Sequence, residues 1–129
     1  IRERRQTRGT DADAITAAAK QVAQTLDAAA IVTFTTTGST TLRAARERPT
    51  VPILGLTPDV GTARRLVLTW GVHPVETSHF TEFNDVVNCA TDVAAKEKFA
   101  TPGQRLIITA GVPFGTPGTT NVLRIVWVE

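Results

Sequence analysis

Apolar residues follow two spacings along this chain, and their alternation predicts an α/β fold. Short apolar runs are typical of strands buried on both faces, whereas apolar residues three or four apart are typical of helices. Helices between the first four expected strands favour parallel pairing, and the last two strands, with none between them, favour an antiparallel hairpin. The prediction is a single three-layer α/β domain with a five-stranded mixed, mostly parallel sheet flanked by helices. Strands are expected at 30–34, 51–56, 72–76, 105–110 and 120–128, and helices at 11–29, 41–47, 60–70 and 81–98.

The first expected helix has one apolar face, and Thr10 or Asp11 is expected to cap its N-terminus. Four residues recur at the spacing of that face and are expected to be buried; they are Ile15, Ala19, Val22 and Leu26.

The densest run of hydroxyl side chains follows the first expected strand, and we call residues 35–40 the threonine turn. It consists of Thr35, Thr36, Thr37, Gly38, Ser39 and Thr40. A strand is expected to become a helix here, and the free N–H groups and dipole of a helix N-terminus favour an anion. The run therefore favours a phosphate-binding turn over a plain helix cap. No lysine follows the glycine, as a Walker A motif requires, and one glycine does not make a dinucleotide-binding fingerprint.

A loop rich in glycine and proline separates the last two expected strands. Such loops in compact domains are more often functional than idle. Because ligands of open α/β sheets bind beyond the carboxyl ends of parallel strands, we expect this loop beside the threonine turn, as a lid over the ligand. The lid residues are Gly111, Val112, Pro113, Phe114, Gly115, Thr116, Pro117, Gly118 and Thr119.

The remaining polar residues offer no catalytic pattern. His73 and His79 have no partner at metal-ligand spacing, and Cys89 is expected to pack on the apolar side of a helix. Asp59 is expected to interact with the dipole at the start of the helix at 60–70. No carboxylate pair or serine triad is evident, so neither a metal nor a catalytic residue is predicted.

Charge and composition point to one domain with a basic arm. The chain has 129 residues and a net charge of +2, but four arginines stand against one glutamate in residues 1–9. No aromatic residues interleave with these arginines, so a solvated linker is favoured over a nucleic-acid contact. A single cysteine and the lack of a long apolar run favour a reducing cytoplasm and no membrane span. Methionine is absent, so we expect a fragment in which residues 1–9 are the linker from a preceding domain.

Three ordered blocks resemble the C-terminal domain of pyruvate kinase, and the resemblance runs from about residue 10 to 129. The threonine turn, the TARRLVLTWGVHP string and the closing GTTN are specific in combination. The blocks are AIVTFTTTGSTTLRAARERP at 30–49, ILGLTPDVGTARRLVLTWGVHPV at 53–75 and LIITAGVPFGTPGTTNVLRI at 106–125.

The resemblance implies a regulatory and oligomerisation domain without catalytic residues of its own. In that family Mg²⁺, K⁺, phosphoenolpyruvate and ADP bind in separate domains, so no cofactor is expected within this chain. The resemblance implies that the parent enzyme is a cytoplasmic, homotetrameric transferase of glycolysis, which transfers a phosphoryl group from phosphoenolpyruvate to ADP. The resemblance also implies that the threonine turn holds the phosphate of an allosteric effector and that the loop at 111–119 folds over it.

One departure from the pattern of this family bears on the size of the expected ligand. Members that respond to fructose 1,6-bisphosphate can carry a basic residue in the turn, where this chain has Thr36 and Ser39, and no arginine or tryptophan lies in the middle of 77–90. A monophosphate such as AMP, ribose 5-phosphate or glucose 6-phosphate is therefore expected. Two alternatives remain open at this point: a sugar-phosphate domain of the sugar-isomerase type, and a structural interaction domain in which the threonines are only caps.

Overall fold

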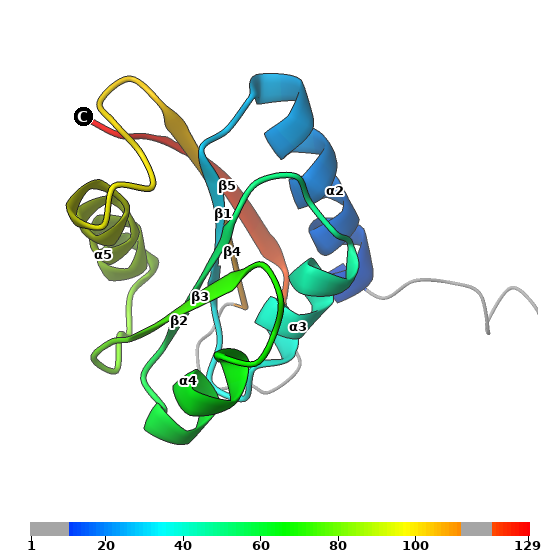
Figure 1. Cartoon of the computed structure of the whole chain (residues 1–129), viewed down its shortest axis with the longest axis vertical. Coiled ribbons are helices and arrows are strands. Elements are labelled where there is room, and N and C mark those ends of the chain that lie inside the picture. Colours follow the sequence, from blue (N-terminus) through cyan, green and yellow to red (C-terminus); the bar gives the residue numbers. More distant parts are fainter. Residues whose placement is uncertain (1–10, 112–119) are drawn as a thin grey trace, which may run out of the picture.

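A five-stranded sheet divides the part of the chain that the computed structural model describes, residues 11–111 and 120–129 (Figure 1). The strand order is β3-β2-β1-β4-β5. The first four strands pair in parallel and β5 pairs antiparallel with β4, as the sequence predicts. The strands are β1 (Ala30–Phe34), β2 (Ile53–Thr57), β3 (Val72–Glu76), β4 (Arg105–Ala110) and β5 (Val122–Trp127). The helices of the described residues are α2 (Asp11–Leu26), α3 (Ser39–Arg46), α4 (Val60–Leu66) and α5 (Phe83–Lys96).

Helices cover both faces of the sheet, which confirms the three-layer prediction. Figure 1 shows α5 on one side of the sheet, and α2 and α3 on the other. On the α5 side, Val32 and Leu54 pack in one core cluster with Ala90. On the other side, Ile31 packs in a second cluster with Ala19. Successive residues of β1 thus enter opposite layers, and every residue of β1 and β2 is buried.

Several of the expected helix boundaries are wrong, including both ends of the helix expected at 81–98, which spans Phe83–Lys96, and backbone geometry explains three of them. The first helix ends at Leu26, not at 29, because Asp27 adopts a positive φ of 53°. The helix expected at 60–70 ends at Leu66, because Leu68 N–H donates to the Arg65 carbonyl in a tighter turn. The helix expected at 41–47 begins earlier, at Ser39, since Gly38 is its N-cap.

The buried face of α2 also differs from the expected one. Of the four apolar residues expected there, Ala19 is buried, whereas Ile15, Val22 and Leu26 are half-buried. Small side chains let the helix approach the sheet closely, and the longer ones lie along the flanks of the contact. The residues that α2 buries are Ala12, Thr16, Ala19 and Ala23.

The carboxyl ends of the parallel strands meet at one edge of the sheet. Phe34 at the end of β1 is in register with Ala110 at the end of β4, and Leu56 of β2 flanks β1 on the other side. Gly111 therefore leaves the sheet next to the threonine turn. The lid positions 112–119 lie outside the described residues, as do 1–10 with the expected cap Thr10. Among the described helices, none has the length and apolarity that a bilayer-spanning segment requires.

Candidate functional site

The threonine turn joins β1 to α3, and its shape depends on Gly38. This residue has φ 98° and ψ −8°, a left-handed conformation that glycine adopts without steric cost. A Cβ atom at Gly38 would lie 3.4 Å from Cγ2 of Thr62, a residue of α4. The turn therefore packs against the neighbouring helix at its glycine, where a Cβ would be in ordinary van der Waals contact, so the positive φ is what favours glycine.

Two hydroxyls of the turn are buried and stabilise its shape. The Gly38 N–H donates to Oγ1 of Thr35 over 2.9 Å. Oγ1 of Thr40 lies 2.8 Å from Oγ1 of Thr120, the first described residue after the expected lid. Of the six expected phosphate-binding residues, Thr35 and Thr40 thus use their hydroxyls within the protein, while the Thr40 contact links the turn to the start of the last strand.

The other side chains of the turn face solvent. Thr36 and Thr37 are exposed and Ser39 is half-buried. Ser39 N–H and Oγ lie 3.4 and 3.3 Å from Oγ1 of Thr37, at the long limit of hydrogen bonding. Helix bonding in α3 begins with Leu42 N–H donating to the Gly38 carbonyl, so the N–H groups before it precede the helix ladder. Hydroxyl and amide donors converge at this point, which is the chemistry of an anion-binding helix N-terminus.

The adjacent turn between β2 and α4, here the aspartate turn (residues 57–62), is built differently. Asp59 is the N-cap of α4, and its Oδ1 accepts a 2.9 Å hydrogen bond from the Thr62 N–H. Asp59 N–H in turn donates to Oγ1 of Thr57 over 3.2 Å. This turn supplies its own carboxylate to the N–H groups of its helix.

One side chain joins the two turns. Oγ1 of Thr62 donates to the carbonyl of Thr36 over 2.7 Å and accepts from Nη2 of Arg65 over 2.9 Å. Thr62 and Arg65 are absent from the sequence-based site because local spacing does not show which strand–helix units lie side by side. The expected strand order could have indicated these two residues, since neighbouring parallel strands place the turns that follow them along one edge of the sheet.

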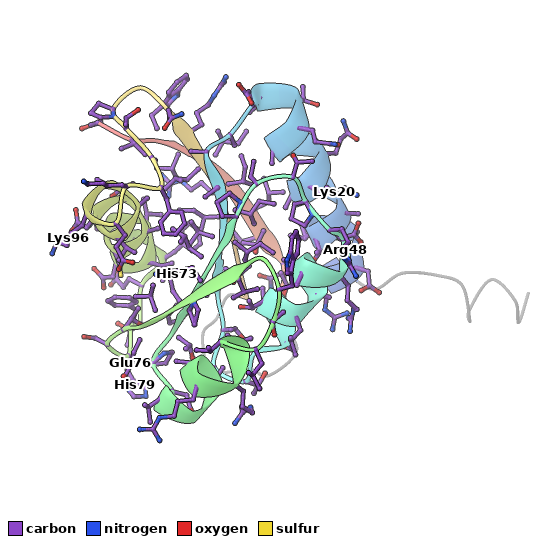
Figure 2. The ribbon with its side chains drawn as sticks, in the orientation of Figure 1. Lys20, Arg48, His73, Glu76, His79 and Lys96 are labelled. Carbon is purple, nitrogen blue, oxygen red and sulfur yellow. The ribbon has the colours of Figure 1, made fainter. Side chains whose placement is uncertain are left out.

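Other groups that the sequence analysis considered form no second site. Figure 2 shows His73 on β3 and His79 beyond it. Nε2 of His73 lies 2.6 Å from Oε1 of Glu97, so this histidine joins a strand to the end of α5. Burial raises the pKa of the Cys89 thiol, and the Asp92 carboxylate raises it further, which disfavours the reactive thiolate. Within residues 11–111 and 120–129 no three metal-ligating side chains cluster.

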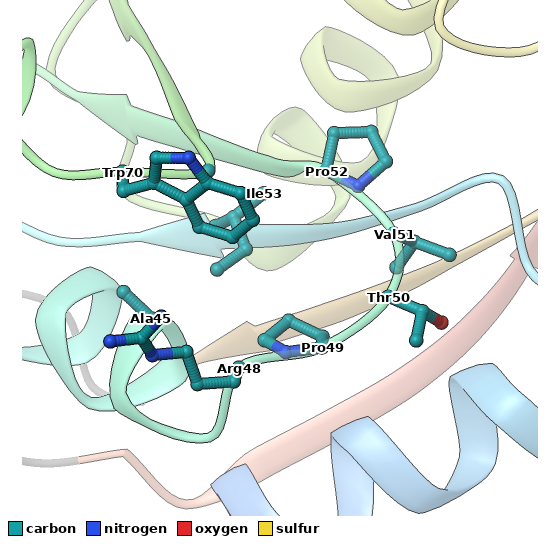
Figure 3. A pocket seen from close by; sticks show the side chains of 9 residues that line it. Ala45, Arg48, Pro49, Thr50, Val51, Pro52, Ile53 and Trp70 are labelled. Carbon is teal, nitrogen blue, oxygen red and sulfur yellow. The ribbon is translucent and has the colours of Figure 1, made fainter.

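A small apolar pocket lies at the opposite edge of the sheet, before the strands β2 and β3 begin (Figure 3). Its volume is about 140 Å³, and Trp70 on its rim is 78% exposed. Pro49, Pro52 and Ile53 contribute most of an aliphatic lining, with Arg48 at one side. The pocket lacks the convergent polar groups that orient a ligand, whereas the threonine turn provides them.

The chain is similar to pyruvate kinases along nearly its whole length. Residues 13–126 match the family described as "Pyruvate kinase, alpha/beta domain". The pyruvate kinase of Methylorubrum extorquens is 48% identical over 119 residues, which are 92% of this chain and 25% of that protein. The pyruvate kinase of Clostridium acetobutylicum is 35% identical over 91% of this chain and 25% of its own length.

Solved structures give the same result. A crystal structure of a pyruvate kinase from Cryptosporidium parvum superimposes with a TM-score of 0.87 and 25% identity, over 95% of this chain and 24% of that one. The present chain thus spans about a quarter of the length of these relatives.

Proposed function

Since the chain belongs to the family of pyruvate kinase α/β domains, we propose that it is a regulatory domain that binds a phosphorylated effector at the threonine turn. The catalytic parts of the longer relatives, which need Mg²⁺ and K⁺, are then its partners. Residues 1–9 are the connection to them, and the whole enzyme is a cytoplasmic homotetramer of glycolysis. In this proposal residues 10–129 carry regulation and subunit contacts, and the phosphoryl transfer occurs elsewhere.

One observation supports the proposed effector site: α3 starts without a carboxylate cap and with exposed hydroxyls around its first N–H groups. Its N-cap is Gly38, and Thr36, Thr37 and Ser39 stand on the solvent side of the turn. A phosphate oxygen accepts hydrogen bonds from such donors, and the helix dipole favours its charge. The buried Thr35 and Thr40 hold the donors in place.

The composition of the turn favours an effector with one phosphate group. A single helix N-terminus lined by neutral hydroxyls suits AMP or a sugar monophosphate better than fructose 1,6-bisphosphate. No hydrogen bond or ion pair in the described residues connects a glutamate or histidine to the turn. An isomerase would need such a base near the sugar, so this geometry favours binding over catalysis.

The contact between Thr40 and Thr120 connects the threonine turn to the segment that leads into β5, so a change in the turn can affect the edge of the sheet. Their hydroxyls are 2.8 Å apart, and β5 begins two residues after Thr120. A ligand that orders the turn would also favour one arrangement of the segment leading into β5. We propose that effector binding shifts the population of subunit arrangements through this edge of the sheet.

Thermal unfolding of the chain with AMP, ribose 5-phosphate or glucose 6-phosphate tests the effector site. A ligand at ten times its dissociation constant stabilises the folded state by about 1.4 kcal/mol, which raises the Tm by about 3–5 °C for a domain of this size. The double variant Thr37→Ala/Ser39→Ala should lose this rise and keep its own Tm within about 2 °C, because both residues are solvent-facing.

The matched control is Thr25→Ala/Thr50→Ala, which removes two exposed hydroxyls away from the threonine turn, in α2 and before β2. This variant should respond to ligand like the wild type. If none of the three phosphates raises the Tm of the wild-type chain at concentrations up to about ten millimolar, the chain has no effector site of this kind. The threonines are then caps, as in a structural interaction domain.

A further inference from the structure

The threonine turn contains no charged side chain, although it is proposed to hold a phosphate. Positive charge is present on the neighbouring helix, where Arg64 and Arg65 occupy the last turn of α4. Both side chains are exposed. The two arginines differ in one respect: Arg65 donates to Thr62, which contacts the threonine turn, and Arg64 forms no such hydrogen bond with the described residues.

A chain of two hydrogen bonds links Arg65 to the threonine turn. Nη2 of Arg65 donates to Oγ1 of Thr62 over 2.9 Å, and Oγ1 of Thr62 donates to the carbonyl of Thr36 over 2.7 Å. Since Thr62 is buried and its methyl group packs close to Gly38, this bridging hydroxyl is well fixed. The guanidinium is therefore directed along α4 toward its N-terminal end, where the aspartate turn borders the threonine turn.

Arg65 forms no ion pair with any residue that the structure describes. Within the described residues, the ion pairs shorter than 4.0 Å join Arg43 to Asp13 and His73 to Glu97. The Asp59 carboxylate, which caps α4, lies near Arg65: a Cβ at Gly61 would lie 3.2 Å from Oδ1 of Asp59 and 3.6 Å from Nη1 of Arg65. Asp59 reduces the local positive potential, and among the described residues the guanidinium donates through Nη2 to Thr62.

We propose that Arg65 is the cationic residue of the effector site and determines its preference for a dianionic phosphate monoester. The inference rests on the function proposed above and assigns to that site a residue from a second strand–helix unit. An arginine donor adds a charge-assisted hydrogen bond to the neutral donors of the threonine turn. A phosphate monoester is favoured over a phosphodiester of the same size, because the diester carries a single negative charge.

Isothermal titration of the chain with glucose 6-phosphate, compared among Arg65→Gln, Arg65→Lys and Arg64→Gln, tests this assignment. Arg65→Gln should weaken binding by roughly three- to tenfold, a modest factor because the guanidinium is exposed to solvent. Arg65→Lys should recover part of the loss, since it restores the charge without the planar fork. Arg64→Gln, one position away on the same helix, should change binding by less than about twofold.

Salt dependence separates a charge contact from a structural role. Raising the ionic strength from about 0.05 to 0.3 M shortens the Debye length and should weaken wild-type binding more than binding to Arg65→Gln. Equal losses in Arg65→Gln and Arg64→Gln, or equal salt dependence of the wild type and Arg65→Gln, would overturn the role of Arg65 while leaving the effector site intact. A wild-type chain that binds no phosphate at all would overturn the effector site, and this inference with it.

Discussion

Two neighbouring turns of this domain occupy equivalent places in the fold, but they cap the N-termini of their helices in different ways. Both follow a buried parallel strand and open a short helix, and their strands pair at Phe34 and Leu56. The aspartate turn caps its helix with the Asp59 carboxylate, which accepts the Thr62 N–H. The threonine turn places Gly38 at the same position, with a left-handed backbone and no side chain.

The difference indicates where an external anion can bind. A helix start that already holds a carboxylate has its N–H groups partly satisfied and its dipole compensated, so a second anion would be repelled. A helix start with hydroxyls and a glycine adds no negative charge, although the Gly38 and Ser39 N–H groups donate to threonine hydroxyls of the same turn. The aspartate turn therefore serves as an internal reference for the threonine turn: it occupies the equivalent place in the fold, with an extended N-cap residue whose carboxylate accepts an N–H of its helix, whereas the threonine turn has a left-handed glycine and no carboxylate.

The largest expected effect tests which hydroxyls at the start of α3 are structural. Oγ1 of Thr41 lies 2.6 Å from Oγ1 of Thr33, and both residues are fully buried. Thr41→Val leaves the Thr33 hydroxyl in the core without its partner, which should cost about 2 kcal/mol of unfolding free energy. Urea unfolding measures this loss, and the dissociation constant for glucose 6-phosphate should stay within about twofold because Thr41 faces the core.

The double variant Thr33→Val/Thr41→Val is the control for that prediction. Replacing both hydroxyls removes the unsatisfied group, so it should be less destabilised than the sum of the single variants. Additive losses would mean that the two hydroxyls are not a coupled pair. A phosphate affinity that falls with Thr41→Val would mean that the division into structural and ligand-facing hydroxyls is wrong.

The next effect comes from giving the threonine turn the anion that the aspartate turn has. Ser39→Asp places a carboxylate in the first turn of α3, where it should compete with phosphate and raise the dissociation constant at least about tenfold, or 1.4 kcal/mol. The same charge should stabilise the free chain by about 0.3–1 kcal/mol through the helix dipole. Calorimetric titration and thermal unfolding measure the two changes separately.

Ser39→Asn is the matched control, because it keeps the shape of the aspartate without its charge. It should weaken phosphate binding less than Ser39→Asp does. If both variants bind phosphate as tightly as the wild type, the N-terminus of α3 is not the binding site, and the contrast between the turns has no functional meaning.

Much of this fold could be predicted because the sequence patterns were local. The five strands and their mixed pairing followed from apolar runs and from the absence of a helix before the last strand, and the bounds of β1, β3 and β4 agree with those expected. Boundaries set by single backbone angles were less predictable. A positive φ at Asp27 ended α2 early, although aspartate is not a usual helix terminator at that position.

The site was predictable in part, for a related reason. The hydroxyl run and its glycine were visible in the sequence. Which hydroxyls bond within the protein and which face solvent depends on contacts across the fold. Thr40 meets Thr120, which is eighty residues away, and the carbonyl of Thr36 meets Thr62 of another strand–helix unit. Local spacing carries no information on such pairs, so the contact of Arg65 with Thr62, on which its proposed role rests, could not be predicted from the sequence. Whether residues 112–119 close over the turn stays a prediction.

The smallest effect removes the internal anion from the aspartate turn. Asp59→Ala deletes the carboxylate that accepts the Thr62 N–H, and should cost about 1 kcal/mol of stability, typical of a lost N-cap. Asp59→Ser should recover most of this, since a hydroxyl also caps. Phosphate binding should be unchanged or tighter by less than about threefold, because a nearby negative charge is gone while the threonine turn keeps its donors. Thermal unfolding with and without glucose 6-phosphate measures both quantities, and a loss of phosphate binding in Asp59→Ala would show that the two turns act as one site rather than as alternatives.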